Sequence, residues 1–536
     1  MNWKELLNVN RIRKSQVDDK RKELSNNTDN RNPFESDFGR VIFSSASRRL
    51  HDKTQVFPLT TNDNIHSRLT HSLEVMNIGL SFSIYLCDNE EFKQKTGLDE
   101  IQILREISPI LKTACLVHDI GNPPFGHFGE EIIQDYFKNL IDELKKIIEN
   151  KNGKTSELSM HIYHGVEKTE YAGPNEKIDE KIQERRKCFQ INALTDFLRN
   201  QYLQNDYIQF DGNAEGFRVL TKLQYLGDLN GLNLTYATLS ATLKYPNYKC
   251  ADKRNANIGK HKHGVFFTER EILNQIAKEC GTGSKDGSFF RHPLSYLMEA
   301  ADSICYLIMD IEDANQKQWI TLKEIKDYIQ NAPLISEETK KALLKNTTIT
   351  SGKNNYYKKE WVSFRTTLLS HLMGVATHNF VTNLENILNG TYNEELIEDG
   401  DGVAKSLNKL SRDIILSNRE IISLEITGEA VISGILDAYI KYFFHTNKAF
   451  RNRGKALISR SIFMTVLHEH QEKYKDDEDF KMKYGEYQDS IEELYKEFDV
   501  ADFTVEERFR LIRDFIAGMT DKFALNHIQK LNGQKI

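Results

Sequence analysis

Proline, cysteine and long apolar runs are scarce in this chain of 536 residues. With only nine prolines, little interrupts long helices. The six cysteines lack the Cys-x-x-Cys spacing of zinc clusters and redox motifs, which indicates reduced thiols in an intracellular protein rather than a disulfide frame. No run of about 18 apolar residues occurs, and the charged N-terminus lacks the apolar stretch of a signal peptide. We therefore predict a cytoplasmic protein without membrane contact.

An excess of basic residues and a glycine-rich phosphate loop are also missing. The net charge of -6 and the pI near 6.3 argue against a nucleic-acid coat protein. Neither Gly-x4-Gly-Lys-Ser/Thr nor Gly-x-Gly-x-x-Gly is present, so a bound phosphate group would depend on side chains and a metal. Taken singly, basic residues such as Lys53 and Arg218 are expected to be solvated charges.

Apolar residues recur with helical spacing over much of the chain, which predicts an all-α fold. The clearest stripe runs over 101–117 and stops at a Gly/Pro turn. Further helices are expected at 73–86, 294–314, 363–388, 430–444, 458–473 and 506–528. Only around Gly264 do we expect a short β-hairpin.

The composition divides the chain into three regions. Residues 1–35 are polar and predict an N-terminal arm, 36–330 a helical core, and 331–536 a C-terminal helical region. Within the core, the lysine-rich segment 142–186 is expected to be an insertion at the surface.

Chemistry concentrates between Cys115 and Glu130, where an apolar run ends in the adjacent pair His118 and Asp119. An imidazole beside a carboxylate offers nitrogen and oxygen ligands to one cation. His127 and Glu130 follow three residues apart, a spacing that places both on one side of a helical turn. This stretch therefore predicts half of a metal site together with a proton-transfer pair.

His71 and Asp302 are the candidates for the missing ligands. A lone helical histidine is more often structural than a ligand, but Asp302 lies among Ala, Ile and Cys, where an unpaired carboxylate is costly to bury. Two imidazoles and two carboxylates suit Mn, Fe, Ni, Co or Mg better than a thiolate-rich zinc site does.

Asp302, Tyr306 and Asp310 are spaced i, i+4 and i+8, along one stripe of a helix. A polar outer face is the alternative interpretation. Because isoleucine and leucine occupy much of the remaining helix surface, we favour a stripe that lines a pocket.

The order His71, His118-Asp119, Asp302 resembles that of the HD phosphohydrolase superfamily. Longer motifs, spread between about Phe34 and Ala524, resemble those of the bacterial dGTP triphosphohydrolases. They are Lys53-Thr-Gln-Val-Phe-Pro-Leu, Arg68-Leu-Thr-His-Ser-Leu-Glu-Val, His118-Asp-Ile-Gly-Asn-Pro-Pro-Phe-Gly-His-Phe-Gly-Glu, Phe210-Asp-Gly-Asn-Ala-Glu-Gly-Phe-Arg, Met298-Glu-Ala-Ala-Asp and Asp514-Phe-Ile-Ala-Gly-Met-Thr-Asp.

This resemblance implies an HD-domain helical fold with helical insertions and a C-terminal helical extension that completes the base pocket and makes oligomer contacts. It implies hydrolysis of dGTP at the α-phosphorus to deoxyguanosine and tripolyphosphate. It also implies that the protein is a homo-oligomer, namely a hexamer. One divalent ion, Mn²⁺ or Mg²⁺, would be held by His71, His118, Asp119 and Asp302. His127 would work at the scissile phosphate with Glu130 beside it, either as nucleophile or as general acid/base.

The same matching implies a set of substrate contacts. Phosphate contacts are expected from Asn213, Lys244, Tyr245 and Lys262, deoxyribose contacts from Gln55 and Tyr306, guanine contacts from Asp310, Glu425 and Arg451, and a further substrate contact from Arg68.

Two alternative functions remain open at this point. One is a broader dNTP triphosphohydrolase controlled by nucleotide at a second site. The other is a sensor of single-stranded DNA that uses the HD site, with the basic segment 40–53 contributing to DNA binding. The acidic composition and the complete set of site residues favour the hydrolase.

Overall fold

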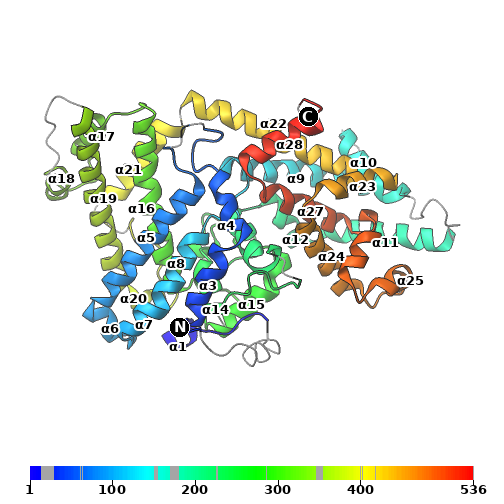
Figure 1. Ribbon diagram of the computed structural model, residues 1–536, viewed down its shortest axis with the longest axis horizontal. Coiled ribbons are helices and arrows are strands. Elements are labelled where there is room, and N and C mark those ends of the chain that lie inside the picture. The colour runs from blue at the N-terminus through cyan, green and yellow to red at the C-terminus, as the bar shows by residue number, and fades with distance from the viewer. Residues whose placement is uncertain are drawn as a thin grey trace.

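The computed structural model describes residues 1–13, 29–60, 62, 64–149, 155–169, 180–224, 227–284, 287–345, 354–398, 400, 402–416 and 418–534. Throughout these residues the regular elements are helices, and β-type pairing is limited to isolated bridges such as Thr54 with Ser67. The predicted all-α fold is confirmed. Figure 1 shows an elongated molecule, with helix α22 (Arg419–Phe443) running along its upper side. None of the described helices is long and apolar enough to cross a membrane.

The largest apolar core forms where α5 (Arg68–Cys87), α8 (Ser108–Val117) and α16 (Pro293–Gln316) pack together. Both sides of residue 330 contribute to it. The other helices around this core are α1 (Trp3–Leu6), α6 (Glu90–Thr96), α7 (Glu100–Gln102), η2 (Ile103–Ile107), α17 (Leu322–Asn331), α18 (Glu337–Leu344), α19 (Asn354–Thr382), α20 (Leu384–Leu388), α21 (Val403–Ser411) and η6 (Arg412–Leu416).

A second core forms on the other side of the molecule, where α9 (Gly126–Ile148) packs against α22. It is completed by α10 (Glu157–Lys168), α11 (Glu180–Arg199), α12 (Gln201–Ile208), α23 (Lys448–Leu457), α24 (Arg460–Tyr474), α25 (Glu478–Tyr484), η7 (Gly485–Tyr487), α26 (Ile491–Glu497), η8 (Val500–Asp502), α27 (Val505–Ala517) and α28 (Asp521–Leu531). A smaller third cluster lies among α3 (Pro33–Ile42), α4 (Ser45–Arg49), α13 (Gly212–Arg218), η3 (Val219–Leu223), α14 (Tyr236–Thr242) and α15 (Arg270–Glu279). The remaining short helices are η1 (Leu50–Asp52), η4 (Ile258–Lys260) and η5 (Phe267–Glu269).

Local capping fixes where the site helices begin. The Ser67 hydroxyl accepts a hydrogen bond from the Thr70 N–H at 3.3 Å, and Thr70 Oγ1 accepts one from the Ser67 N–H at 2.9 Å. This reciprocal cap starts α5 just before His71. Pro293 occupies the first position of α16, where its missing N–H costs nothing.

The helix expected over 506–528 is two helices. α27 ends at Ala517, and α28 begins after Thr520, whose hydroxyl accepts a hydrogen bond from the Phe523 N–H at 3.2 Å. The intervening turn aims the Asp521 carboxylate at the backbone N–H groups of Thr54 and Phe125, 3.0 and 2.9 Å away. The break therefore brings the C-terminal region to the stretch that carries the His-Asp pair. The helix expected over 101–117 is confirmed: α7, η2 and α8 follow one another without a break, with one π-helical turn at Ile103–Ile107, and end at Val117.

Our prediction of a short β-hairpin around Gly264 is wrong. The N–H groups of Gly264 and Val265 both donate to the Asn247 carbonyl, at 3.0 and 3.1 Å. Further on, the Phe267 N–H donates to the buried carboxylate of Asp206 at 2.7 Å. Because distant acceptors satisfy these donors, no partner strand is needed, and the chain continues into η5.

Two segments expected at the surface contribute to the cores. Trp3 and Leu6 of the expected arm are buried, whereas residues 14–28 lie outside the described residues. Within the expected insertion, α10 packs on α9 and α22 and buries Ile162 and Val166, and the parts at 150–154 and 170–179 lie outside the described residues.

Candidate active site

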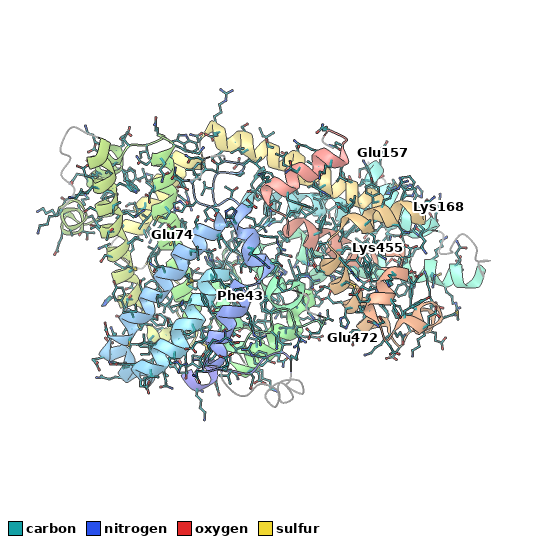
Figure 2. The ribbon with its side chains drawn as sticks, in the orientation of Figure 1. Phe43, Glu74, Glu157, Lys168, Lys455 and Glu472 are labelled. Atoms are coloured by element: carbon teal, nitrogen blue, oxygen red, sulfur yellow. The ribbon has the colours of Figure 1, made fainter. Side chains whose placement is uncertain are left out.

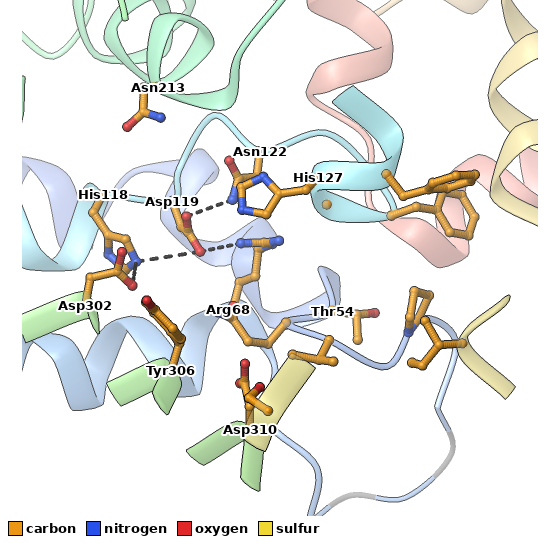
Figure 3. Close-up of a pocket in the computed structure, with 18 of the residues that line it drawn as sticks. Thr54, Arg68, His118, Asp119, Asn122, His127, Asn213, Asp302, Tyr306 and Asp310 are labelled. Atoms are coloured by element: carbon orange, nitrogen blue, oxygen red, sulfur yellow. Dashed lines mark hydrogen bonds and ion pairs between the residues drawn. The ribbon is translucent and has the colours of Figure 1, made fainter. Parts of the chain in front are cut away.

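A cavity of about 650 Å³ lies where α5, α16 and the turn between α8 and α9 meet (Figure 3). Most of the residues expected at the site line it, although they come from segments far apart in the sequence. The predicted residues along its wall are Gln55, Arg68, His118, Asp119, His127, Asn213, Lys244, Tyr245, Lys262, Asp302, Tyr306, Asp310 and Glu425.

The four expected metal ligands converge at one end of this cavity. One ligand atom from each of His71, His118 and Asp119 lies within 4.8 Å of the others. Asp302 Oδ1 is 3.1 Å from His71 Nε2 and 3.3 Å from His118 Nε2. His71 is buried behind the wall and reaches the cluster from the first turn of α5.

The donor set fits a divalent cation. His118 Nδ1 lies 2.7 Å from the Cys115 carbonyl, which can only accept, so Nδ1 carries a proton and Nε2 is the nitrogen that a metal ion would bind. Nε2 is buried and has no hydrogen-bond partner among the described residues. Burial would lower the pKa of His118, but the charges of Asp119 and Asp302 raise it to about 9. This negative environment also attracts a metal ion.

Asp119 is held from both sides. Its Oδ2 accepts a hydrogen bond from the Arg68 guanidinium, and its Oδ1 accepts one from Asn122 Nδ2 at 2.7 Å. Burial would raise the pKa of Asp119, but Arg68 and His118 hold it well below its ordinary value. The carboxylate is therefore kept ionised in a fixed orientation, as a metal ligand requires.

His127 and Glu130 form the expected pair at the start of α9. Nδ1 of His127 lies 2.9 Å from Glu130 Oε2, while Oε1 of Glu130 accepts a hydrogen bond from the Gly212 N–H at 2.8 Å. Glu130 is buried, whereas the His127 ring is exposed toward the cavity. The negative charge of Glu130 and its hydrogen bond raise the pKa of His127 above its ordinary value.

The turn that separates the two groups is strained. Phe125 and Gly126 both adopt left-handed backbone conformations, with φ of 64° and 60°. Left-handed backbone is costly at a bulky residue such as Phe125. At Gly126, a Cβ atom would lie only 2.6 Å from the Arg68 guanidinium, so a larger residue would have to displace that side chain from its position beside Asp119.

Two lysines give the cavity a positive wall. Lys244 Nζ is 3.3 Å from Glu299, and Lys262 Nζ is 3.3 Å from Asp211. The Tyr245 ring lies between them, with the two ammonium groups 5.6 and 6.0 Å from its centroid. Each lysine is anchored by a carboxylate and still faces the cavity.

The cavity wall also carries further carboxylates and a second arginine. Burial and the charge of Asp313 raise the pKa of Asp310 well above its ordinary value, so this carboxyl suits hydrogen-bond donors better than cations. Glu425 lines the cavity from α22, and the Arg412 guanidinium lines it from η6. Among the described residues the Arg412 side chain forms neither a hydrogen bond nor an ion pair, so its donors are available.

Arg451 is not part of the cavity, contrary to our expectation. It is fully buried in α23, where its Nε and Nη2 donate to the Asp499 carboxylate at 2.8 and 2.7 Å. The remaining nitrogen donates to two backbone carbonyls. Four of its five N–H donors are thus used within the protein, and its full burial closes the guanidinium to a ligand.

Sequence reasoning missed three residues at or beside the site. Arg412 matches no family motif, and Asn122 belongs to the His-Asp motif without a predicted role. The third is Lys53, which was expected to be a solvated charge but is buried. Arg218 carried the same expectation and is also buried, where it pairs with Glu269 and Asp514. A lysine directly before the largely apolar Thr-Gln-Val-Phe-Pro-Leu was the available signal for Lys53.

Comparison with known proteins agrees with this geometry. The HD domain family matches residues 68–187, which include three of the four expected ligands but not Asp302. A deoxyguanosinetriphosphate triphosphohydrolase-like protein of Listeria monocytogenes is 31% identical over 99% of this chain and 100% of its own length. A deoxyguanosinetriphosphate triphosphohydrolase of Yersinia pseudotuberculosis is 31% identical over 93% of each chain. The chain therefore belongs to the deoxyguanosinetriphosphate triphosphohydrolase family of HD-domain phosphohydrolases.

Proposed function

We propose that this protein hydrolyses dGTP to deoxyguanosine and tripolyphosphate. One observation carries the proposal. The His-Asp cluster and the His127–Glu130 pair face one cavity that also holds two anchored lysines and groups suited to a purine. This reaction needs a metal site, a proton-transfer pair, a cationic wall for the phosphates and a pocket for the base.

His71, His118, Asp119 and Asp302 would hold one divalent ion, Mn²⁺ or Mg²⁺. Such an ion, when bound, supplies a Lewis acid for an α-phosphate oxygen. Arg68 keeps Asp119 ionised and adds a positive charge at the cavity wall. These residues together favour binding of a phosphate group at this end.

His127 is the residue placed to work on the reacting oxygens. Its ring is exposed to the cavity, and Glu130 fixes the orientation of the ring through Nδ1. Nε2 is left free for a proton or for the phosphorus, so the ring can act as a general acid/base or as a nucleophile. Glu130 stabilises the imidazolium that either role generates.

Contacts with the departing tripolyphosphate would come from four residues that line the cavity, namely Lys244, Lys262, Tyr245 and Asn213. A triphosphate carries several negative charges, and two lysines on one wall match them. Gln55 and Tyr306 would contact the deoxyribose, leaving little room for a 2′-hydroxyl.

Guanine suits the hydrogen-bonding groups of the cavity wall. Its N1–H and N2–H₂ groups donate, and Asp310 and Glu425 offer acceptors. Its O6 and N7 accept, and Arg412 takes the role that Arg451 was expected to fill. Adenine presents a donor at position 6 and lacks the N2 amine, so it fits this arrangement less well.

The test is product analysis. The protein is incubated separately with dGTP, dATP, dCTP, dTTP and GTP plus Mn²⁺, and the products are resolved by ion-exchange chromatography. Deoxyguanosine and tripolyphosphate are expected from dGTP. Nucleoside monophosphate with pyrophosphate would overturn the proposed reaction. Equal rates on all four deoxynucleotides would overturn guanine preference and favour the broader dNTP triphosphohydrolase.

A further inference from the structure

Lys53 lies in an unusual environment directly behind the cavity. Its side chain is only 3% exposed, and its Nζ donates to the backbone carbonyls of Asn122 and Ala517, the latter at 2.8 Å. Among the described residues no carboxylate lies within ion-pair distance of this ammonium. Lys53 is therefore a buried lysine whose bonded partners are backbone oxygens.

Stability alone does not account for such a residue. A buried cation without a directly paired carboxylate loses its hydration, and neutral carbonyls together with the more distant charges of Asp521 and Glu215 restore only part of that free energy. Burial, followed by the charges of Arg49 and Arg68, lowers the pKa of Lys53 to about 7. An apolar side chain of the same length would fill the space but would make neither hydrogen bond, so what these two bonds connect is the property that distinguishes Lys53.

Those hydrogen bonds join three distant segments. Lys53 begins the stretch that carries Thr54 and Gln55, Asn122 lies in the turn between α8 and α9, and Ala517 ends α27. The Asn122 side chain in turn donates to Asp119 Oδ1 at 2.7 Å. Lys53 is thus one step removed from an expected metal ligand.

The same turn is fixed at its other end. Asp521, which begins α28, accepts hydrogen bonds from the Phe125 N–H and from both the N–H and the hydroxyl of Thr54. Of the left-handed residues, Phe125 is itself the second attachment and Gly126 follows it directly. A strained turn persists only where its surroundings hold it, and Lys53 and Asp521 supply that support.

We propose that Lys53 is a positioning residue that holds the Asp119–Gly126 turn against the end of α27 and, through Asn122, orients Asp119 for the metal ion. The proposal rests on the proposed function for the identity of the metal site. The two proposals make different predictions, because the role of Lys53 predicts a change in metal affinity that can be measured without substrate.

Lys455 offers a matched control. It is also a buried lysine, 9% exposed, and its Nζ also donates to two backbone carbonyls, those of Tyr495 and Phe498. Burial lowers its pKa to about 8. It lies in α23 (Figure 2) and does not line the cavity, so it reproduces the local chemistry without the connection to Asp119.

The experiment compares Lys53→Met with Lys455→Met in the full-length protein. Mn²⁺ affinity of the metal-free protein is measured by titration calorimetry, melting temperature by scanning calorimetry, and kcat and KM with dGTP. For Lys53→Met we expect Mn²⁺ affinity to fall about 10-fold or more and kcat to fall with it, because lost support of a ligand has that effect. For Lys455→Met we expect both to stay at the wild-type value.

A double-mutant cycle with Asn122→Ala tests the route. If Lys53 acts through Asn122, Lys53→Met should weaken Mn²⁺ binding far less in the Asn122→Ala background than in the wild type. If Lys53→Met does not fold, Lys53→Gln replaces it, because the glutamine side chain is one atom shorter than lysine and cannot place its nitrogen between both carbonyls; the same loss of affinity is expected.

Unchanged Mn²⁺ affinity in a folded Lys53 variant, or fully additive losses in the cycle, would overturn the positioning role. The proposed function fails in a different way. A wild-type protein that binds Mn²⁺ but releases no tripolyphosphate would refute the reaction, while the comparison of metal affinities would still decide the role of Lys53.

Discussion

Arg451 and Asp499 form a bidentate ion pair inside the second core, with nitrogen to oxygen distances of 2.8 and 2.7 Å. Both side chains are buried. Removing one partner would leave the other charge buried without compensation. We therefore expect Arg451→Met to lower the free energy of unfolding by about 3–5 kcal/mol. Chemical denaturation measures this.

The same variant tests whether Arg451 contacts guanine. KM for dGTP of the folded fraction is expected to stay unchanged. Arg453→Met is the control on the same helix, because Arg453 is exposed and should cost little stability. A large rise in KM without loss of stability would contradict our placement of Arg451.

Metal binding and proton transfer should separate by mutation. His127 lies outside the ligand cluster, so we expect His127→Ala to lose roughly 10²-fold or more in kcat and to keep Mn²⁺ affinity. Asp302→Ala removes a ligand and should lose both. Calorimetric titration with Mn²⁺ and a dGTP turnover assay distinguish the two variants. Near-native turnover in His127→Ala would refute its role.

Glu130 should set the pH dependence of the reaction. Its charge raises the pKa of His127, and Glu130→Gln removes that charge while keeping an acceptor for the Gly212 N–H. The pKa of His127 should then fall, so the limb of the kcat/KM profile that His127 controls should move to lower pH. A shift of the acidic limb identifies His127 as a base, and a shift of the alkaline limb as an acid. A profile that stays in place would contradict the pairing.

Arg412 should determine guanine preference. Arg412→Ala removes the donors for O6 and N7, so the ratio of kcat/KM for dGTP over dATP should fall by about 10-fold, a typical value for one bidentate contact. Arg419→Ala is the control, because Arg419 is exposed at the start of α22 and lies outside the cavity wall. An unchanged ratio would exclude Arg412 from base recognition.

The sequence was most informative where chemistry and helical spacing coincide. His118 and Asp119 end a helix, Asp302 and Tyr306 share a stripe, and the structure brings these groups to one cavity. A carboxylate in an apolar helix must have a partner, so the amino-acid sequence alone was enough to connect Asp302 with His118.

Other features depend on partners that no local pattern reveals. Arg451 looked available for guanine because Asp499, its partner, is 48 residues away in the sequence. The Gly264 segment looked like a hairpin because Asp206 binds its backbone from a distant helix. Lys53 looked solvated because two backbone carbonyls, which carry no sequence signal, surround it.

Helix α16 carries Asp302, Tyr306 and Asp310 on three successive steps of one rigid rod. Eight residues at 1.5 Å per residue set about 12 Å along the axis between the metal end and the base end. Under the proposed function, this fixed spacing makes the helix a ruler for the substrate. A ligand would have to place a phosphate at one end and hydrogen-bond donors at the other. Inorganic phosphate or free guanine would satisfy only one end, so selection by length would precede any choice among the bases.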